Sequence, residues 1–219
     1  MVPLKVFYSK NIDLLLAKFL ERLFSLFLKT HKVCHVALAG GKTPLELYRL
    51  LSQRSLKWDR LRFYLSDERY VPIDSELSNY RNVSLSLSRR AKIAFFKTEM
   101  DIYECAMDYS LQLPERLHIA LLGVGKDGHT ASLFPGVECE KVSQKVCVSL
   151  SPDGTKRLSL TEEYLSDSCV VIFFLKGEEK AQVLKELLEG KDIPANRIRG
   201  RLKTYVFTDL LSQVITPCP

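Results

Sequence analysis

The sequence has little that would mark a disulfide scaffold or a metal centre. Its six cysteines, spread over 219 residues, stand at irregular spacings and form no CxxC pair. That spacing argues against a zinc site and against a dense disulfide framework. Cys34 and Cys169 fall in apolar runs and are expected as small buried side chains. We predict reduced thiols, as is usual in the cytoplasm, for Cys34, Cys105, Cys139, Cys147, Cys169 and Cys218.

Long uninterrupted apolar runs are also missing. The most membrane-like stretch, residues 12–28, is broken by four charged side chains that fall on one stripe at helical spacing, Asp13, Lys18, Glu21 and Arg22. We therefore predict a heavily buried amphipathic helix here. The start of the chain shows no charged, apolar and cleavage-site series of the kind found in secretion signals. A cytoplasmic protein without a membrane partner is expected.

Nothing in the sequence marks a nucleic-acid-binding protein or a divided chain. The formal net charge of +6 is spread over residues 57–62, 89–92 and 197–203, without interleaved aromatic residues or a recognisable binding module. This pattern argues against a nucleic-acid partner, although it suits a small anionic substrate. No linker or repeat interrupts a composition with 46% hydrophobic and 26% charged residues. We expect one domain over residues 1–219, as a monomer or a small homo-oligomer.

Short apolar runs alternate with longer amphipathic segments along the chain. This order is typical of a layered α/β fold with right-handed crossovers. We predict a single-domain, Rossmann-like, mostly parallel sheet with helices on both faces. The expected strands are residues 5–8, 33–39, 62–65, 93–96, 117–122, 146–150, 169–175 and 204–207. The expected helices are residues 11–29, 44–53, 79–87, 101–111, 161–166 and 178–188.

A histidine loop follows one of the most apolar of these strands, residues 117–122. Three glycines lie within the six residues before His129, the only nearby side chain that can exchange a proton near neutral pH. Open parallel sheets bind ligands beyond the carboxyl ends of their strands. The loop is therefore a candidate site in which His129 carries protons and Asp127 orients it. The alternative is a structural histidine beside an ordinary glycine turn.

A glycine pair follows the second strand. Gly40 and Gly41 can expose backbone N–H groups in front of a helix, where the partial positive charge of the helix terminus favours a phosphate. We predict that Thr43 is the N-cap of this helix, with Pro44 at the first helical position and Glu46 completing a capping box. The Walker and GxGxxG spacings are absent, so nucleotide binding is not indicated. An ordinary turn before a capped helix is the alternative.

Charged side chains follow two other strands. Asp67, Glu68 and Arg69 come directly after the third strand, where Arg69 could bind a phosphate in bidentate fashion and Asp67 could accept hydrogen bonds from sugar hydroxyls. Lys180 lies in the first turn of a helix, where a cation opposes the helix dipole unless an anion is near. Lys42 could add positive charge at the glycine pair. The alternative for the cluster of two acids and an arginine is a set of surface ion pairs. The alternative for Lys180 is a side chain that simply reaches solvent. Because parallel strands end at one edge of the sheet, we expect these loops to meet.

Four segments resemble those of the 6-phosphogluconolactonase family, over nearly the whole chain. They are AGGKTPLELYRLL, WDRLRFYLSDERYVP followed by SN, GVGKDGHTASLFPG, and FFLKGEEKAQVLKELLEG. The resemblance implies a fold shared with glucosamine-6-phosphate deaminases and ribose-5-phosphate isomerases. It also implies hydrolysis of a phosphorylated sugar lactone, 6-phosphogluconolactone, in the oxidative pentose phosphate pathway, without a metal ion or cofactor.

The resemblance and the chemistry of a lactone together assign roles to single residues. His129 is the expected general base, with Asp127 or another carboxylate fixing its tautomer. Backbone amides near Gly125 or Gly128 are expected to contact the oxyanion. Residues expected around the substrate are Gly40, Gly41, Lys42, Thr43, Asp67, Arg69, Asn79, Gly125 and Lys180. The tail after residue 193 matches the family only loosely, so no role is assigned to Arg197, Arg199 and Arg201.

Three other functions compete with this one. A glucosamine-6-phosphate deaminase would continue from the histidine into a segment resembling FNEPG, whereas residues 130–136 read TASLFPG and lack that glutamate. A non-catalytic sugar-phosphate sensor would be favoured by loss of the histidine or by a fused DNA-binding module, and neither is seen. A serine hydrolase would need a GxSxG elbow, which is absent, so Ser132 is expected to support the loop.

Overall fold

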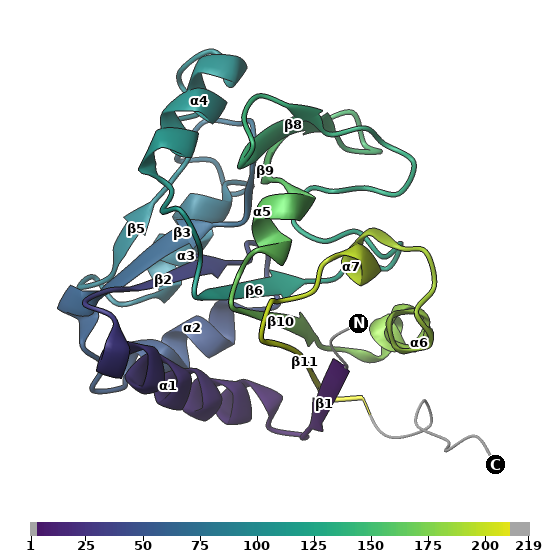
Figure 1. Cartoon of the computed structure of the whole chain (residues 1–219). Coiled ribbons are helices and arrows are strands. Elements are labelled where there is room, and N and C mark those ends of the chain that lie inside the picture. Colours follow the sequence, from purple (N-terminus) through teal and green to yellow (C-terminus); the bar gives the residue numbers. More distant parts are fainter. Residues whose placement is uncertain (1–3, 211–219) are drawn as a thin grey trace.

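The computed structural model describes residues 4–210 and shows a seven-stranded sheet flanked by helices (Figure 1). The strand order is β1-β11-β10-β6-β2-β3-β5, and every neighbouring pair is parallel. The strands are β1 (Leu4–Tyr8), β2 (Cys34–Leu38), β3 (Leu61–Leu65), β5 (Lys92–Ala94), β6 (Ile119–Gly123), β10 (Val170–Leu175) and β11 (Lys203–Thr208). The predicted α/β class and mostly parallel sheet are confirmed.

Helices cover both faces of this sheet. In Figure 1, α1 (Ile12–Thr30) lies below the sheet and α5 (Glu162–Ser166) lies above it. As expected, α1 buries one apolar stripe, which runs from Ile12 to Phe27 at intervals of three or four residues. The other helices are α2 (Leu45–Ser52), α3 (Asn79–Ser86), α4 (Ile102–Gln112), α6 (Ala181–Glu189) and α7 (Pro194–Arg197), with 3-10 turns η1 (Trp58–Arg60) and η2 (Glu178–Lys180). Among the described helices, none is long and apolar enough to cross a membrane.

A second sheet corrects the strand prediction. β8 (Val146–Leu150), which was expected in the main sheet, belongs to a four-stranded antiparallel sheet with the order β4-β9-β8-β7. The sequence did not indicate its other strands, β4 (Asp67–Arg69), β7 (Glu140–Lys141) and β9 (Lys156–Leu160). These strands are short and rich in charged side chains, so they lack the apolar run that marks β6 and β10.

The start of α2 differs from the predicted capping box. The helix begins at Leu45, its N-cap position is Pro44, and no side chain caps it. The N–H of Leu45 donates to the carbonyl of Lys42 at 3.3 Å, which closes a turn ahead of the helix and leaves Thr43 outside it. Glu46 instead forms a 3.2 Å ion pair with the arginine three residues later.

The prediction of reduced thiols is wrong for one pair. Cys139 and Cys147 form a disulfide, with their Cα atoms 5.5 Å apart. Cys139 directly precedes β7 and Cys147 lies in β8, so the antiparallel pairing of these strands brings the two residues together. Their spacing of eight residues did not reveal this hairpin. The free thiols of the described chain are Cys34, Cys105 and Cys169, and Cys218 lies outside the described residues.

Candidate active site

Loops from four neighbouring strands meet at the carboxyl edge of the parallel sheet. The segments after β2, β3, β6 and β10 border a cavity of about 440 Å³. Ten of the eleven residues predicted for the site line it: Gly40, Gly41, Thr43, Asp67, Arg69, Asn79, Gly125, Asp127, His129 and Lys180. Lys42 has an exposed side chain and is not part of the lining. The expected meeting of distant loops at one edge is confirmed.

The imidazole of His129 is held by a neighbouring carboxylate. Its Nδ1 lies 2.5 Å from Oδ1 of Asp127, which also accepts the backbone N–H of His129 at 3.2 Å. Burial raises the pKa of Asp127, but the charge and hydrogen bonds of His129 lower it more, so the net shift of this pKa is downward. An ionised partner at Nδ1 fixes the tautomer and leaves Nε2 to accept a proton.

Two glycines make room in this loop. A Cβ on Gly125 would lie 2.1 Å from Nδ1 of His129, so the imidazole needs a glycine at this position. Gly128 has a φ of +84°, and its Cβ would meet Ile193 at 2.6 Å. The N–H of Gly125 donates to the carbonyl of His129 at 2.8 Å, and the N–H of Gly128 donates to the carbonyl of Gly125 at 3.1 Å. Both amides therefore hold the loop in the structure, and the expected oxyanion contact from amides near these glycines stays a prediction.

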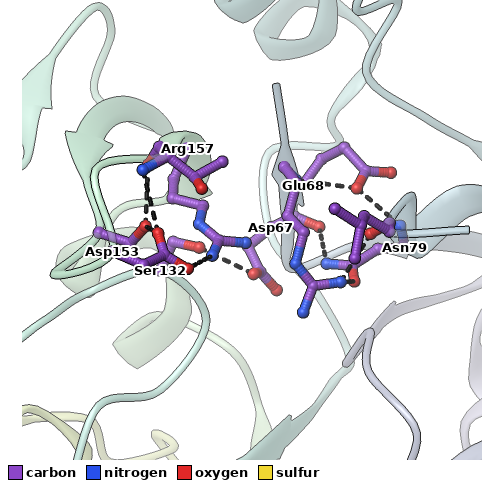
Figure 2. A network of polar contacts seen from close by, with 10 residues as sticks. Asp67, Glu68, Asn79, Ser132, Asp153 and Arg157 are labelled. Carbon is purple, nitrogen blue, oxygen red and sulfur yellow. Dashed lines mark hydrogen bonds and ion pairs between the residues drawn. The ribbon is translucent and has the colours of Figure 1, made fainter. Parts of the chain in front are cut away.

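The segment after His129 is anchored to the second sheet. The hydroxyl of Ser132 donates to Oδ2 of Asp67 at 2.8 Å (Figure 2), and its backbone N–H donates to Oγ of Ser159 in β9 at 3.2 Å. Ser132 therefore ties the histidine loop to β4 and β9, which agrees with a supporting role. The ring of Phe134 packs against His129, with the centroids 4.9 Å apart.

Asn79 joins the glycine loop to β4. Its Oδ1 accepts the N–H of Gly41 and Nη1 of Arg69, each at 3.3 Å, and its Nδ2 donates to the carbonyl of Asp67 at 3.0 Å (Figure 2). A Cβ on Gly40 would lie 2.0 Å from the Asn79 side chain, so this contact requires glycine. One amide side chain thus links two of the predicted binding segments.

Arg157 in β9 is a cation of the cavity wall that the sequence did not indicate. It stands directly opposite Arg69 in the β4–β9 pairing, and both side chains line the cavity. Its Nη2 lies 3.6 Å from Oδ2 of Asp153, while its buried Nε has no hydrogen-bond partner within residues 4–210. Burial, followed by the charge of Arg69, lowers the pKa of Arg157. Like charges directly opposite in a sheet are destabilising, so this pair suits an anion between them.

The two lysines after β10 differ in their partners. Nζ of Lys180 donates to the carbonyl of Val124 at 2.7 Å, and burial lowers the pKa of this lysine. Nζ of Lys176 lies 2.6 Å from a carboxylate oxygen of Asp13, which neutralises its charge within the fold. Lys180 therefore adds to the positive charge of the cavity wall, whereas Lys176 contributes little.

The cavity combines an oriented imidazole with cations and a glycine loop. Within the described residues, no group of three or more His, Cys, Asp or Glu side chains is arranged to hold a metal ion. Cations and amide donors suit an anionic group, and an imidazole with a free ring nitrogen suits proton transfer from water. The arrangement fits a small anionic substrate that reacts with water.

Comparison with known proteins shows which family this chain resembles over most of its length. A family model described as glucosamine-6-phosphate isomerases/6-phosphogluconolactonase matches residues 10–206. The chain belongs to this family. A 6-phosphogluconolactonase of Thermotoga maritima is 35% identical over 208 residues, which cover 90% of this chain and 93% of that protein. A 6-phosphogluconolactonase of Treponema pallidum is 36% identical over 189 residues, which cover 77% of this chain and 78% of that one.

Solved structures of family members have the same fold. The crystal structure of Thermotoga maritima 6-phosphogluconolactonase matches with a TM-score of 0.82 and 30% identity, covering 95% of this chain and 99% of that one. A 6-phosphogluconolactonase structure from Trypanosoma brucei matches with a TM-score of 0.84 and 23% identity, covering 98% of each chain, and it bears on the fold alone. The fold and family indicated by the four sequence segments are confirmed.

Proposed function

We propose that this chain hydrolyses 6-phospho-D-glucono-1,5-lactone to 6-phosphogluconate in the oxidative pentose phosphate pathway. Relatives that are 35% and 36% identical over most of the chain are named 6-phosphogluconolactonase, which supports an enzyme of this kind. The observation that carries the proposal is the single cavity onto which the His129–Asp127 pair and the Arg69–Arg157 pair both open. The His129–Asp127 pair suits proton transfer, and the Arg69–Arg157 pair suits binding of the phosphate.

His129 is proposed as the general base. With Nδ1 bound to Asp127, Nε2 takes a proton from the water that attacks the lactone carbonyl. The Asp127 carboxylate stabilises the imidazolium that forms. The same imidazolium then gives its proton to the ring oxygen as the C–O bond breaks. A δ-lactone is a reactive ester, so this scheme uses neither a metal ion nor a cofactor.

The phosphate is proposed to lie between the two arginines, close to Lys180 and the glycine loop. Arg69 and Arg157 can each offer paired N–H donors, and Lys180 adds a point charge. A phosphate here would offset both the burial and the charge of Arg69 that lower the pKa of Arg157. Anchoring this end of the substrate holds the lactone carbonyl in register with the base.

The remaining predicted residues are proposed to support the sugar and the loop. Asp67, which accepts hydrogen bonds from Ser66 and Ser132, is proposed to contact sugar hydroxyls. Thr43 lines the cavity outside the helix and can offer its hydroxyl to the phosphate. Lys42 has its side chain outside the cavity lining and is proposed to attract the substrate by charge alone.

Deaminase chemistry is disfavoured at the same site. Residues 130–136 contain no carboxylate, and the aromatic ring of Phe134 packs against His129 at a centroid distance of 4.9 Å. Ring opening and amine release would need a second acid or base behind the histidine, and this segment offers none. We therefore expect no ammonia from glucosamine 6-phosphate.

Turnover of freshly generated 6-phosphogluconolactone, corrected for spontaneous hydrolysis, tests the proposal. Unphosphorylated glucono-1,5-lactone is the matched control, because it has the same ester without the anion. We expect kcat/KM to be at least about 100-fold higher for the phosphorylated lactone, since the anchored phosphate orients the ester. Equal values for the two lactones, or ammonia release from glucosamine 6-phosphate, would contradict the proposal.

The expected setting of the enzyme belongs to the same proposal. A small diffusible sugar phosphate as substrate fits the cytoplasmic location, without a nucleic-acid or membrane partner, that the sequence predicts. A cavity built from one chain fits either a monomer or a small homo-oligomer. Light scattering coupled to size-exclusion chromatography would measure which of the two forms is present.

A further inference from the structure

Glu68 is a buried acid beside the phosphate site to which the proposed reaction gives no role. Glu68 is 1% exposed and does not line the cavity, whereas its neighbours Asp67 and Arg69 do. We propose that Glu68 is a positioning residue for the substrate phosphate, acting through Asn79 on the glycine loop and on Arg69. This inference rests on the proposed function.

The carboxylate of Glu68 joins β4 to the first turn of α3. Oε1 accepts the backbone N–H groups of Arg69 and Asn79 at 2.8 and 2.7 Å (Figure 2). Oε2 accepts the N–H of Tyr80 at 2.7 Å and the hydroxyl of Ser78 at 3.3 Å. Both oxygens are therefore used, and the donors come from two separate segments of the chain.

Helix capping alone does not account for this carboxylate. Ser78 is already the N-cap of α3 and accepts the N–H of Arg81 at 3.1 Å. Burial raises the pKa of Glu68 to about 7, against the lowering effect of its three backbone hydrogen bonds. A side chain that only filled this space would cost less free energy if it were apolar. A carboxylate adds two acceptor atoms that set the position of Asn79 relative to β4.

The side chain of Asn79 carries this placement to the phosphate site. Its Oδ1 contacts both the N–H of Gly41 and the guanidinium of Arg69. A shift of the Asn79 backbone therefore displaces the glycine loop and Arg69 relative to each other. The His129–Asp127 pair comes from the loop after β6 and makes no contact with Glu68 among the hydrogen bonds of the described chain. The effect of Glu68 should fall on substrate binding and leave the chemical step nearly unchanged.

Steady-state hydrolysis by Glu68→Gln tests this inference. Glutamine has nearly the same shape but only one acceptor oxygen in its side chain, so some of the backbone amides lose their partner. We expect KM for 6-phosphogluconolactone to rise about tenfold while kcat changes by less than about threefold. For unphosphorylated glucono-1,5-lactone, kcat/KM should stay within about threefold of the wild-type value.

Two further variants separate positioning from a loss of folding. Asp101→Ala removes the N-cap of α4, where the carboxylate accepts the N–H of Tyr103 at 2.9 Å, and should lower stability without changing KM. Asn79→Ala keeps Glu68 but cuts its link to Gly41 and Arg69. It should raise KM as Glu68→Gln does, and the double variant should show no further increase.

The outcomes distinguish this inference from the proposed function. An unchanged KM in Glu68→Gln, or equal losses of kcat/KM on both lactones, would overturn the inference. If Glu68→Gln does not fold, an unchanged KM in Asn79→Ala overturns it. Absence of lactone turnover in the wild-type protein would instead refute the proposed function. In that case, calorimetry with inorganic phosphate still tests the role of Glu68. Binding about tenfold weaker in Glu68→Gln than in the wild-type protein supports the inference, and equal affinity of the two proteins contradicts it.

Discussion

The residues of the site differ in how visible their roles are in a sequence. The positions of His129 and Arg69 in the cavity could be predicted because each follows an apolar strand, at the edge where parallel sheets bind ligands. Asn79 could be placed only through the resemblance to a family. The roles proposed for Arg157 and Glu68 could not be predicted, because they depend on a cross-strand partner and on backbone donors that only the folded chain brings near these residues.

The role of Arg157 can be tested by changing the number of donors it offers. Arg157→Ala should raise KM for 6-phosphogluconolactone by about 10- to 100-fold with a smaller effect on kcat, because one side of the phosphate loses its partner. Arg157→Lys should recover only part of this loss, since lysine keeps the charge without the paired donors. Steady-state kinetics measure both.

Arg116→Ala is the matched control for this prediction. Its guanidinium pairs with Asp167 at 2.8 Å on the surface, outside the cavity lining. An exposed ion pair of this kind contributes little, so KM should stay at the wild-type value. A wild-type KM in Arg157→Ala would remove Arg157 from the phosphate site.

Secondary-structure elements were predictable where their apolar pattern was continuous. β6 and β10 are buried nearly throughout, and their runs of apolar residues marked them as central parallel strands. β4, β7 and β9 form their pairs across hairpins and long connections. Their charged side chains interrupt the apolar pattern that would have indicated strands. The start of α2 was missed because the turn closed by Lys42 and Leu45 depends on a backbone hydrogen bond and not on a capping side chain.

The hairpin of β7 and β8 should depend on its disulfide. Cys139→Ser should lower the free energy of unfolding by roughly 2–3 kcal/mol, because the unfolded chain is no longer closed into a short loop. A reducing agent should lower the melting temperature of the wild-type protein to about that of Cys139→Ser. It should leave the melting temperature of the variant unchanged. Cys169→Ser, which alters a free thiol, should keep the sensitivity to reductant.

A histidine cluster at the amino ends of β2 and β6 should make stability depend on pH. Nδ1 of His118 accepts the N–H of His35 at 2.9 Å, and burial, with the charges of His31 and His35, lowers the pKa of His118 to about 4. Between about pH 6.5 and 4 the unfolded chain binds a proton here that the folded protein does not. The free energy of unfolding should therefore fall by about 1–3 kcal/mol as the pH drops through this range.

Denaturant unfolding at pH 7 and at pH 4.5 would measure this dependence. His118→Asn is the matched variant, because its side-chain oxygen can still accept the N–H of His35 but carries no titrating group. The variant should lose less stability on acidification than the wild-type protein. An equal loss in both would mean that other groups cause the acid sensitivity.

At the scale of the whole molecule, the two sheets supply different parts of one site. The parallel sheet provides the glycine loop, the histidine loop and Lys180, and these match the segments that the sequence revealed. The antiparallel sheet provides Arg157 and fixes it opposite Arg69. Hydrophobic residues of both sheets share one buried core, so the two halves of the cavity are held in a constant relation.

The kcat of His129→Ala for freshly generated 6-phosphogluconolactone, corrected for spontaneous hydrolysis, tests the central claim most directly. We predict a loss of about 10²- to 10⁴-fold, with KM and melting temperature near the wild-type values, because the base is removed and the phosphate site is untouched. His31→Ala, at an exposed histidine after α1, should retain full turnover. A folded His129→Ala variant with wild-type kcat would contradict the account.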